Sequence, residues 1–145
     1  MGLMDFFKRS NPHVSNVYDY LTHKQKLAAM NLMVVFGGSC SGKEFELNKI
    51  NHIMASEGQA MRISGDEMRA GAAQFNGMVG MVDALVGANH QALKKLFWAL
   101  YCIIAVSKSE QAANVLLGVY SKFGFSEQDC LNILESRTGI KASKL

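Results

Sequence analysis

The sequence is poor in proline and cysteine and contains no apolar run of membrane-spanning length. Pro12 is its one proline, so the rest of the chain can form helices without a proline break. The three cysteines form no C-x-x-C pair, and their odd number favours a reducing cytoplasm over a disulfide framework. The longest apolar run covers residues 96–106, whereas a membrane span needs about 20 residues. We therefore expect a cytoplasmic protein without membrane insertion.

The chain also has only a small excess of positive over negative charge. The formal net charge is +3, and lysine and arginine are spread along the chain. Nucleic-acid binding needs a dense basic stripe, so we expect no nucleic-acid partner. Residues 138–145 form a small basic tail, and residues 1–13 form an amphipathic segment that we expect to be flexible. Lys8 and Arg9 follow the apolar residues of that segment, a pattern that allows weak contact with a membrane surface.

A helix-start signal recurs along the chain. A serine followed three residues later by an acid can form a capping box, in which each side chain bonds a backbone amide of the first turn. The pairs are Ser41 with Glu44, Ser64 with Glu67, Ser107 with Glu110, and Ser126 with Asp129. Four helices are therefore predicted to begin at these serines.

Apolar residues recur at helical spacing between those signals. The predicted stripes are Leu27, Met30 and Val34; Leu47, Ile50 and Met54; Met68, Ala72 and Phe75; and Ala112, Leu116, Val119 and Phe123. Gly58 is predicted to end the second of these helices, and the glycine-rich residues 77–87 are predicted to form a helix packed close to a neighbour. Asn89 is expected to cap a long central helix over residues 90–106. These patterns predict an all-α, single-domain bundle of about seven helices over residues 14–137.

One stretch has the spacing of a phosphate-binding loop, Gly37-x-x-x-x-Gly42-Lys43. Such a loop follows a strand and carries Ser or Thr after the lysine, to bind magnesium. Here Glu44 takes that position, and the residues before Gly37 continue a helical period. The preferred interpretation is a glycine-rich turn between two helices. A nucleotide hydrolase with a degenerate loop is the weakest functional alternative.

Residues 32–50 and residues 100–126 resemble the two signatures of the tellurite-resistance TerB-like family. Residues 32–50 are similar to the first signature, in which an alanine-rich helix runs through an acidic turn into a serine-capped helix with an early glutamate. Residues 100–126 are similar to the second, through "ALYCIIAVSKSE" and "KFGFSEQD", and "MDFFKR" resembles the family's amphipathic entry. The resemblance implies an all-α domain of two packed helical halves that acts without catalysis in bacterial stress and envelope-associated systems.

Some members of that family hold divalent cations through carboxylates in the acidic turns, which implies Glu44 and Glu110 as the corresponding ligands here. The turns of this sequence carry serine and lysine in place of the family's Asp-Gly. A hard cation prefers several carboxylate and carbonyl oxygens. A divalent cation is therefore disfavoured, no cofactor is expected, and both glutamates are interpreted as helix caps.

Nine methionines suggest a second kind of site. Methionine fills irregular gaps in cores and also lines adaptable binding surfaces. The candidate lining of a groove for a partner helix or an apolar ligand consists of Met30, Met33, Met54, Met61, Met68, Met78 and Met81. Met61, Met68, Met78 and Met81 are preferred, because residues 61–87 are rich in Gly, Ala and Met.

Residues suited to catalysis are present only singly. Cys40 precedes a predicted helix start, where the pKa of a thiol can fall, but no histidine is near it in the sequence. Asp66 and Glu67 fit the positive end of a helix dipole. The sequence therefore favours a non-enzymatic TerB-like module that contacts a protein partner in a bacterial stress response. A small carrier with an apolar ligand in a Met-rich cavity is the alternative.

Overall fold

The computed structural model describes residues 16–38 and 43–140, and the chain within these ranges is helical. Its elements are η1 (Val17–Tyr20), α2 (His23–Gly37), α3 (Glu44–Met61), α4 (Gly65–Gly71), η2 (Ala72–Gln74), α5 (Gly77–Leu85), α6 (His90–Ser107), α7 (Glu110–Lys122) and α8 (Glu127–Thr138). The all-α prediction is confirmed, and the described ranges hold seven α-helices, as expected. The predicted segment 1–13, and residues 141–145 of the predicted tail, lie outside the described residues.

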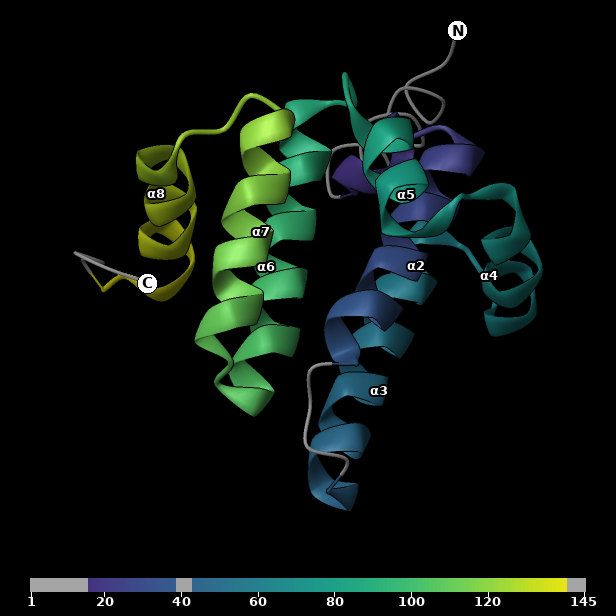
Figure 1. Cartoon of the computed structure of the whole chain (residues 1–145), viewed down its shortest axis with the longest axis horizontal. Coiled ribbons are helices and arrows are strands. Elements are labelled where there is room, and N and C mark those ends of the chain that lie inside the picture. The colour runs from purple at the N-terminus through teal and green to yellow at the C-terminus, as the bar shows by residue number, and fades with distance from the viewer. Residues whose placement is uncertain (1–15, 39–42, 141–145) are drawn as a thin grey trace, which may run out of the picture.

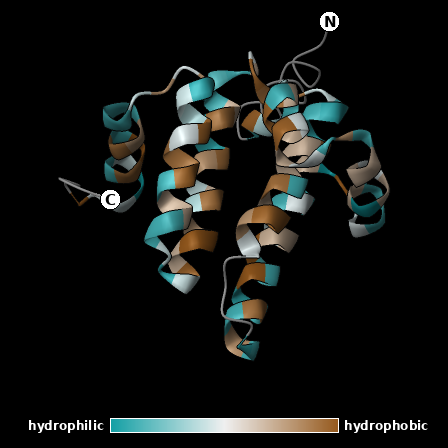
Figure 2. Ribbon diagram, in the orientation of Figure 1, coloured by the Kyte–Doolittle hydropathy of each residue, from teal (hydrophilic) through white to brown (hydrophobic). Residues whose placement is uncertain are grey.

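Helix α6 is the centre of the bundle. It packs against α2, α3, α7 and α8. Figure 1 shows the α6–α7 hairpin beside α2 and α3, with α8 on one flank and α4 and α5 on the other. Asn89 caps α6 by accepting hydrogen bonds from the amides of Gln91 and Ala92. The predicted central helix and its cap are confirmed. Outer helix α8 shows alternating apolar and polar bands in Figure 2, because only one of its faces is buried.

Two of the four predicted capping boxes are present. They belong to Ser64 at α4 and Ser126 at α8, and a third box at Thr22 begins α2. The prediction for Ser107 is wrong, since α6 continues through that residue and α7 is capped by Ser109. The reason is that Ile103 and Ile104 are buried at the end of α6, so the helix gains by continuing past them.

The beginning and end of α3 also differ from the predictions. Glu44 is the first residue of α3 rather than the third, Lys43 is the N-cap without a side-chain bond, and Ser41 lies outside the described residues. The predicted stop at Gly58 is wrong, because α3 continues to Met61, which is 1% exposed. Arg62 ends the helix in the left-handed conformation, at φ 60°, where glycine is the usual residue.

The predicted apolar stripes are buried or partly buried at most positions, and the stripe of Met68, Ala72 and Phe75 is partly buried throughout. Val34 and Leu47 are exceptions, with 47% and 43% of their surfaces exposed. The predicted helix rich in glycine forms α5, whose main neighbour is α2. Close packing of these two helices confirms that prediction and buries Met81, Val82 and Leu85.

An aromatic cluster joins α6, α7 and the α7–α8 connection. The ring of Tyr120 lies edge-on to Phe97, Phe123 and Phe125, with centroid separations of 4.9, 5.0 and 5.4 Å. The Tyr120 hydroxyl donates a hydrogen bond of 2.5 Å to the carbonyl oxygen of Leu93. Edge-to-face rings contribute beyond the area that they bury, so this cluster sets the spacing of α6, α7 and α8.

Candidate functional site

The stretch with phosphate-loop spacing joins two helices. The residues before Gly37 form α2 rather than the strand that a phosphate loop follows. This confirms the helical interpretation of that run. Lys43 and Glu44 are exposed at the start of α3, and residues 39–42, with Cys40 and Gly42, lie outside the described residues.

Glu44 and Glu110 are the first residues of α3 and α7, and both are exposed. A carboxylate at this position is stabilised by the positive end of the helix dipole. The two helix starts lie at the same end of the molecule in Figure 1. Among the residues that the structure describes, no group of three His, Cys, Asp or Glu side chains could hold a metal ion.

The four candidate methionines are placed in different environments. Met61 and Met81 are buried in the core, with 1% and 8% of their surfaces exposed. Met78 is partly buried on α5. Met68 lines a hollow between α3 and α4, which Met30 and Met54 also line. The structure therefore brings together three of the seven candidate methionines, of which only Met68 belongs to the preferred four.

We call this hollow the methionine groove. It has a volume of about 530 Å³, within the range of ligand-binding clefts. Its apolar lining consists of Met30, Met54, Ala55, Gly58, Ile63, Gly65 and Met68. Its polar lining consists of Asn51, Gln59 and Arg62. The sequence signal for the groove is the recurrence of Met54, Ala55 and Gly58 along α3. Only the packing of α4 on α2 shows that this face of α3 remains uncovered.

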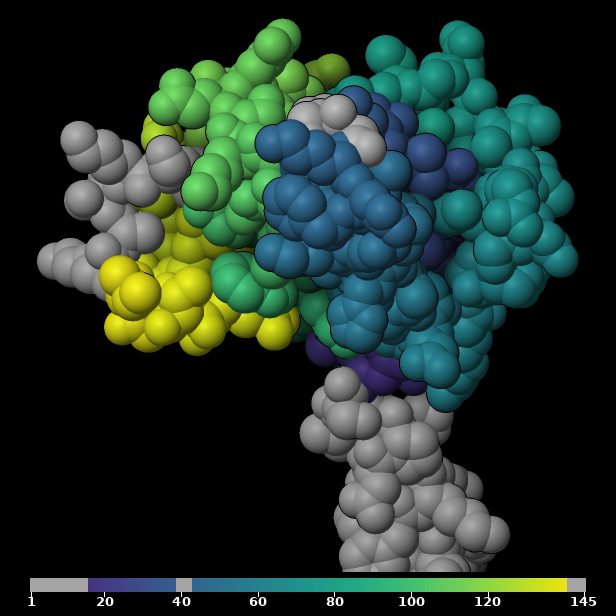
Figure 3. Space-filling model, turned by 90° about the horizontal axis from the view of Figure 1, so that it is seen from below, coloured from purple at the N-terminus to yellow at the C-terminus, as the bar shows by residue number. Residues whose placement is uncertain are grey.

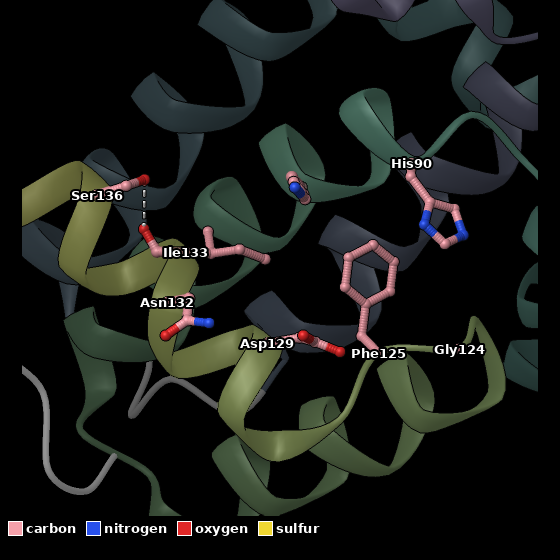
Figure 4. A pocket seen from close by; sticks show the side chains of 8 residues that line it. His90, Gly124, Phe125, Asp129, Asn132, Ile133 and Ser136 are labelled. Carbon is pink, nitrogen blue, oxygen red and sulfur yellow. Dashed lines mark hydrogen bonds between the residues drawn. The ribbon is translucent and has the colours of Figure 1, made fainter.

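A second hollow lies between the start of α6 and α8, and is drawn in Figure 4. His90 and Lys94 line it from α6, and Asp129, Asn132 and Ser136 line it from α8; its volume is about 340 Å³. Sequence reasoning missed this hollow because its two walls are distant along the chain.

Three of the polar side chains of this hollow, Asp129, Ser136 and His90, make contacts within or between helices. Asp129 accepts a 2.8 Å hydrogen bond from the amide of Ser126, which lowers the pKa of the carboxyl. Ser136 donates to the carbonyl of Ile133, as Figure 4 shows, and His90 packs on the ring of Phe125 at 4.8 Å. These bonds give the hollow a structural role, so it is the weaker candidate for a ligand.

A third hollow, of about 210 Å³, places Cys102 beside His52 and Glu57. Cys102 is only partly buried. Burial, and then the nearby charge of Glu57, raises the pKa of the Cys102 thiol. Glu57 accepts a 2.5 Å hydrogen bond from the Tyr18 hydroxyl. The thiol is therefore protonated at neutral pH and is a poor nucleophile.

Exposed apolar side chains concentrate where α2 ends and α3 begins. Val34 and Val35 lie in the last turn of α2, and Phe45 and Leu47 lie in the first turn of α3. Their exposed fractions are 47%, 40%, 58% and 43%. We call these four residues the apolar end. In Figure 1 the start of α3 extends beyond the end of α2, and in Figure 3 this part of α3 faces the viewer between α4 and the α6–α7 hairpin.

No helix in residues 16–38 and 43–140 is long and apolar enough to span a membrane. Comparisons of the chain with protein-family models, with curated proteins and with solved structures found no match. The functional proposal therefore depends on the residues and on their arrangement.

Proposed function

We propose that this chain is a non-enzymatic helical module that binds a partner protein through the apolar end. The proposal places it in the bacterial cytoplasm, in a stress-response system of the tellurite-resistance type. The observation that carries it is the concentration of exposed apolar residues at one end of the bundle. The resemblance of residues 32–50 and 100–126 to the TerB-like signatures supports the assignment to that type of system.

The apolar end has the composition of a protein contact. Its most exposed member, Phe45, is an aromatic residue, a type that often supplies much of the binding energy of an interface. Lys49 places its ammonium 5.6 Å from the centroid of the Phe45 ring. With Lys43 and Glu44, it provides a charged rim around the apolar residues. A partner with an apolar patch gains about 25 cal/mol for each Å² of apolar surface removed from water.

The test is site-specific crosslinking in the cell. A photoreactive phenylalanine analogue at position 45 should crosslink to one partner protein, whereas the same analogue at Val79 should not. Val79 is a fair control because it is 65% exposed and lies on α5. The purified partner should then bind the wild type, and the Phe45→Ser variant should bind at least about tenfold more weakly, whereas Val79→Ser should bind as the wild type does.

Equal crosslinking from positions 45 and 79, or equal binding by both variants, would contradict this proposal. A crosslink between two copies of the chain would replace the partner protein by self-association. The experiment does not require the partner protein to be known in advance. Its readout is the difference in crosslinking yield between positions 45 and 79.

The methionine groove favours a second function, that of a small carrier for an apolar ligand. Three methionines line it, and methionine adapts its three rotatable bonds to ligands of irregular shape. Native mass spectrometry of the protein purified from cells separates the two functions, since a carrier retains a ligand and a module does not.

A further inference from the structure

We infer that the methionine groove binds a long-chain fatty acid, with the acyl chain along Met30, Met54 and Met68 and the carboxylate at Arg62. This inference deepens the carrier function and rests on it. It depends on three features: the way α4 leaves the groove open, the composition of the groove walls, and the placement of its single charge.

The groove is open because α4 packs on α2. A Cβ added to Gly71 would lie 2.9 Å from both terminal carbons of Leu27, so this glycine lets the end of α4 approach α2 closely. Asn31 then fastens the two helices, because its side-chain amide donates to the carbonyls of Leu27 and Met68 at 2.9 and 3.2 Å. Held in this way against α2, α4 forms the far wall of a hollow whose near wall is α3.

The walls suit an acyl chain. The apolar part of the lining includes three thioether side chains and Ile63. Gly58 contributes no side chain, and the methyl carbon of Met30 lies 3.4 Å from the place that its Cβ would take. Removal of a flexible apolar chain from water into such a groove is favourable in proportion to the apolar surface that is buried.

Arg62 supplies the only charge among the residues that line the groove. It occupies a left-handed position, with φ 60° and ψ 40°, where a side chain is disfavoured and glycine is usual. Its side chain is 70% exposed, and its ion partner Asp19 is 3.7 Å away. A guanidinium has five N–H donors, so Arg62 can bind a ligand carboxylate and remain near Asp19.

Charge complementarity therefore selects the ligand class. An apolar groove with one cation and no acid in its lining favours a molecule with an apolar body and a single anionic head. A carboxylate matches the planar fork of arginine in two parallel hydrogen bonds. A fatty acid meets both requirements, whereas a fatty alcohol meets only the first.

The test is a fluorescence titration with cis-parinaric acid, an eighteen-carbon fatty acid that is fluorescent when bound in an apolar site. We expect saturable one-to-one binding to the wild type and competition by palmitate that is stronger than competition by hexadecanol. Arg62→Gly should bind about tenfold more weakly, because it loses a charge-assisted hydrogen bond. Arg62→Lys should recover part of that loss. Arg62→Gly keeps the left-handed conformation without strain, so its thermal midpoint should equal or exceed that of the wild type.

In a second pair of variants, an exposed alanine on a helix is replaced by glutamate, which introduces a carboxylate. Ala55→Glu puts it in the groove wall and should weaken binding by about tenfold, whereas Ala105→Glu, on α6 outside the groove, should have no effect. The absence of saturable binding, or wild-type affinity in both Arg62→Gly and Ala55→Glu, would overturn the inference. Crosslinking at Phe45 tests another surface. If the crosslink is absent but parinarate binds, only the partner-protein proposal is contradicted. If the crosslink forms but parinarate does not bind, only the fatty-acid inference is contradicted.

Discussion

The two sides of the central helix α6 are packed with different side chains. Toward α7 and α8, the aromatic rings around Tyr120 meet edge-on at centroid separations of 4.9 to 5.4 Å. On the other side of the bundle, α2, α3 and α4 meet through leucine, methionine and glycine, as in the contacts of Met30 with Gly58 and of Leu27 with Gly71. The hollow on the aromatic side has a volume of about 340 Å³ and a lining with several polar side chains, whereas the groove on the methionine side has a volume of about 530 Å³ and a mainly apolar lining.

This difference shows how one bundle can combine stability with an adaptable surface. Rigid rings have few rotamers and specific preferred geometries, so the aromatic side has one arrangement. Methionine has three rotatable bonds and tolerates a change of neighbour. The proposed ligand groove therefore lies on the side where the side chains can adjust without disturbing the aromatic cluster.

The largest expected effect is the loss of the aromatic cluster. Tyr120→Ala removes a ring that is 0% exposed and should lower the free energy of unfolding by about 4 kcal/mol, as large-to-small changes in cores do. Urea denaturation measures this value. Tyr120→Phe keeps the ring and loses only the hydrogen bond to Leu93, so it should cost about 1 kcal/mol. Similar losses in the two variants would show that the ring packing is not the source of stability.

A smaller effect is expected on the methionine side. Gly71→Ala places a methyl group against Leu27, which is 2% exposed and must move. The free energy of unfolding should fall by about 2 kcal/mol. Gly118→Ala is the matched control, because no atom lies within 4 Å of the added Cβ in the middle of α7. It should stabilise the protein by up to about 1 kcal/mol, so stabilisation by both variants would contradict the close α2–α4 contact.

The aromatic side should also respond to alkaline pH. Burial, followed by the charges of Asp129 and Glu127, raises the pKa of Cys130 from 9.0 to about 11. The folded state keeps a proton that the unfolded state loses, so this stability is complete below pH 9 and is lost as the pH rises through 11. The slope is at most about 1.4 kcal/mol per pH unit.

Urea denaturation between pH 8.5 and 10 checks this slope. Below pH 10 the tyrosines contribute little, although burial raises the pKa values of Tyr18 and Tyr120. Cys130→Ala should show a shallower dependence, with a remainder from Cys102, whose pKa is also raised. A dependence as steep as that of the wild type would exclude Cys130 as its source.

The smallest effect concerns the cap of α4. Ser64 and Glu67 bond each other's amides at 3.1 Å, and Ser64→Ala should cost about 1 kcal/mol. Native-state hydrogen exchange should detect the loss in the amides of α4, with α6 unchanged, because a short helix beside a groove opens locally. Ser126→Ala removes the equivalent cap of α8 on the aromatic side. Uniform acceleration across all helices in Ser64→Ala would show that α4 unfolds only with the whole bundle.

Local signals predicted much of the fold. The capping boxes of Ser64 and Ser126 and the cap of Asn89 are present because a cap depends on residues within one turn. Prediction failed where two local solutions compete. Ser107 and Ser109 can both begin a helix, and the burial of Ile103 and Ile104 decides in favour of the later start.

The candidate sites were less predictable than the helices. Met61 and Met68 are equivalent as methionines in the sequence, yet Met61 is in the core and Met68 lines the groove. Val34 and Leu47 fit apolar stripes and are nevertheless exposed. Periodicity shows that a helix has an apolar face, but it does not show how far a neighbouring helix covers that face.

The sequence by itself determined that the chain is helical, where several of its helices begin, and which helix is central, because propensity, capping and periodicity act over a few residues. The tertiary structure alone decided which methionines meet, that Arg62 stands at the edge of their groove, and which apolar residues remain uncovered. Those outcomes depend on how α4 packs on α2 and on how far α3 extends beyond the end of α2. They are set by contacts between residues that are distant in the chain, for which the sequence carries no local signal.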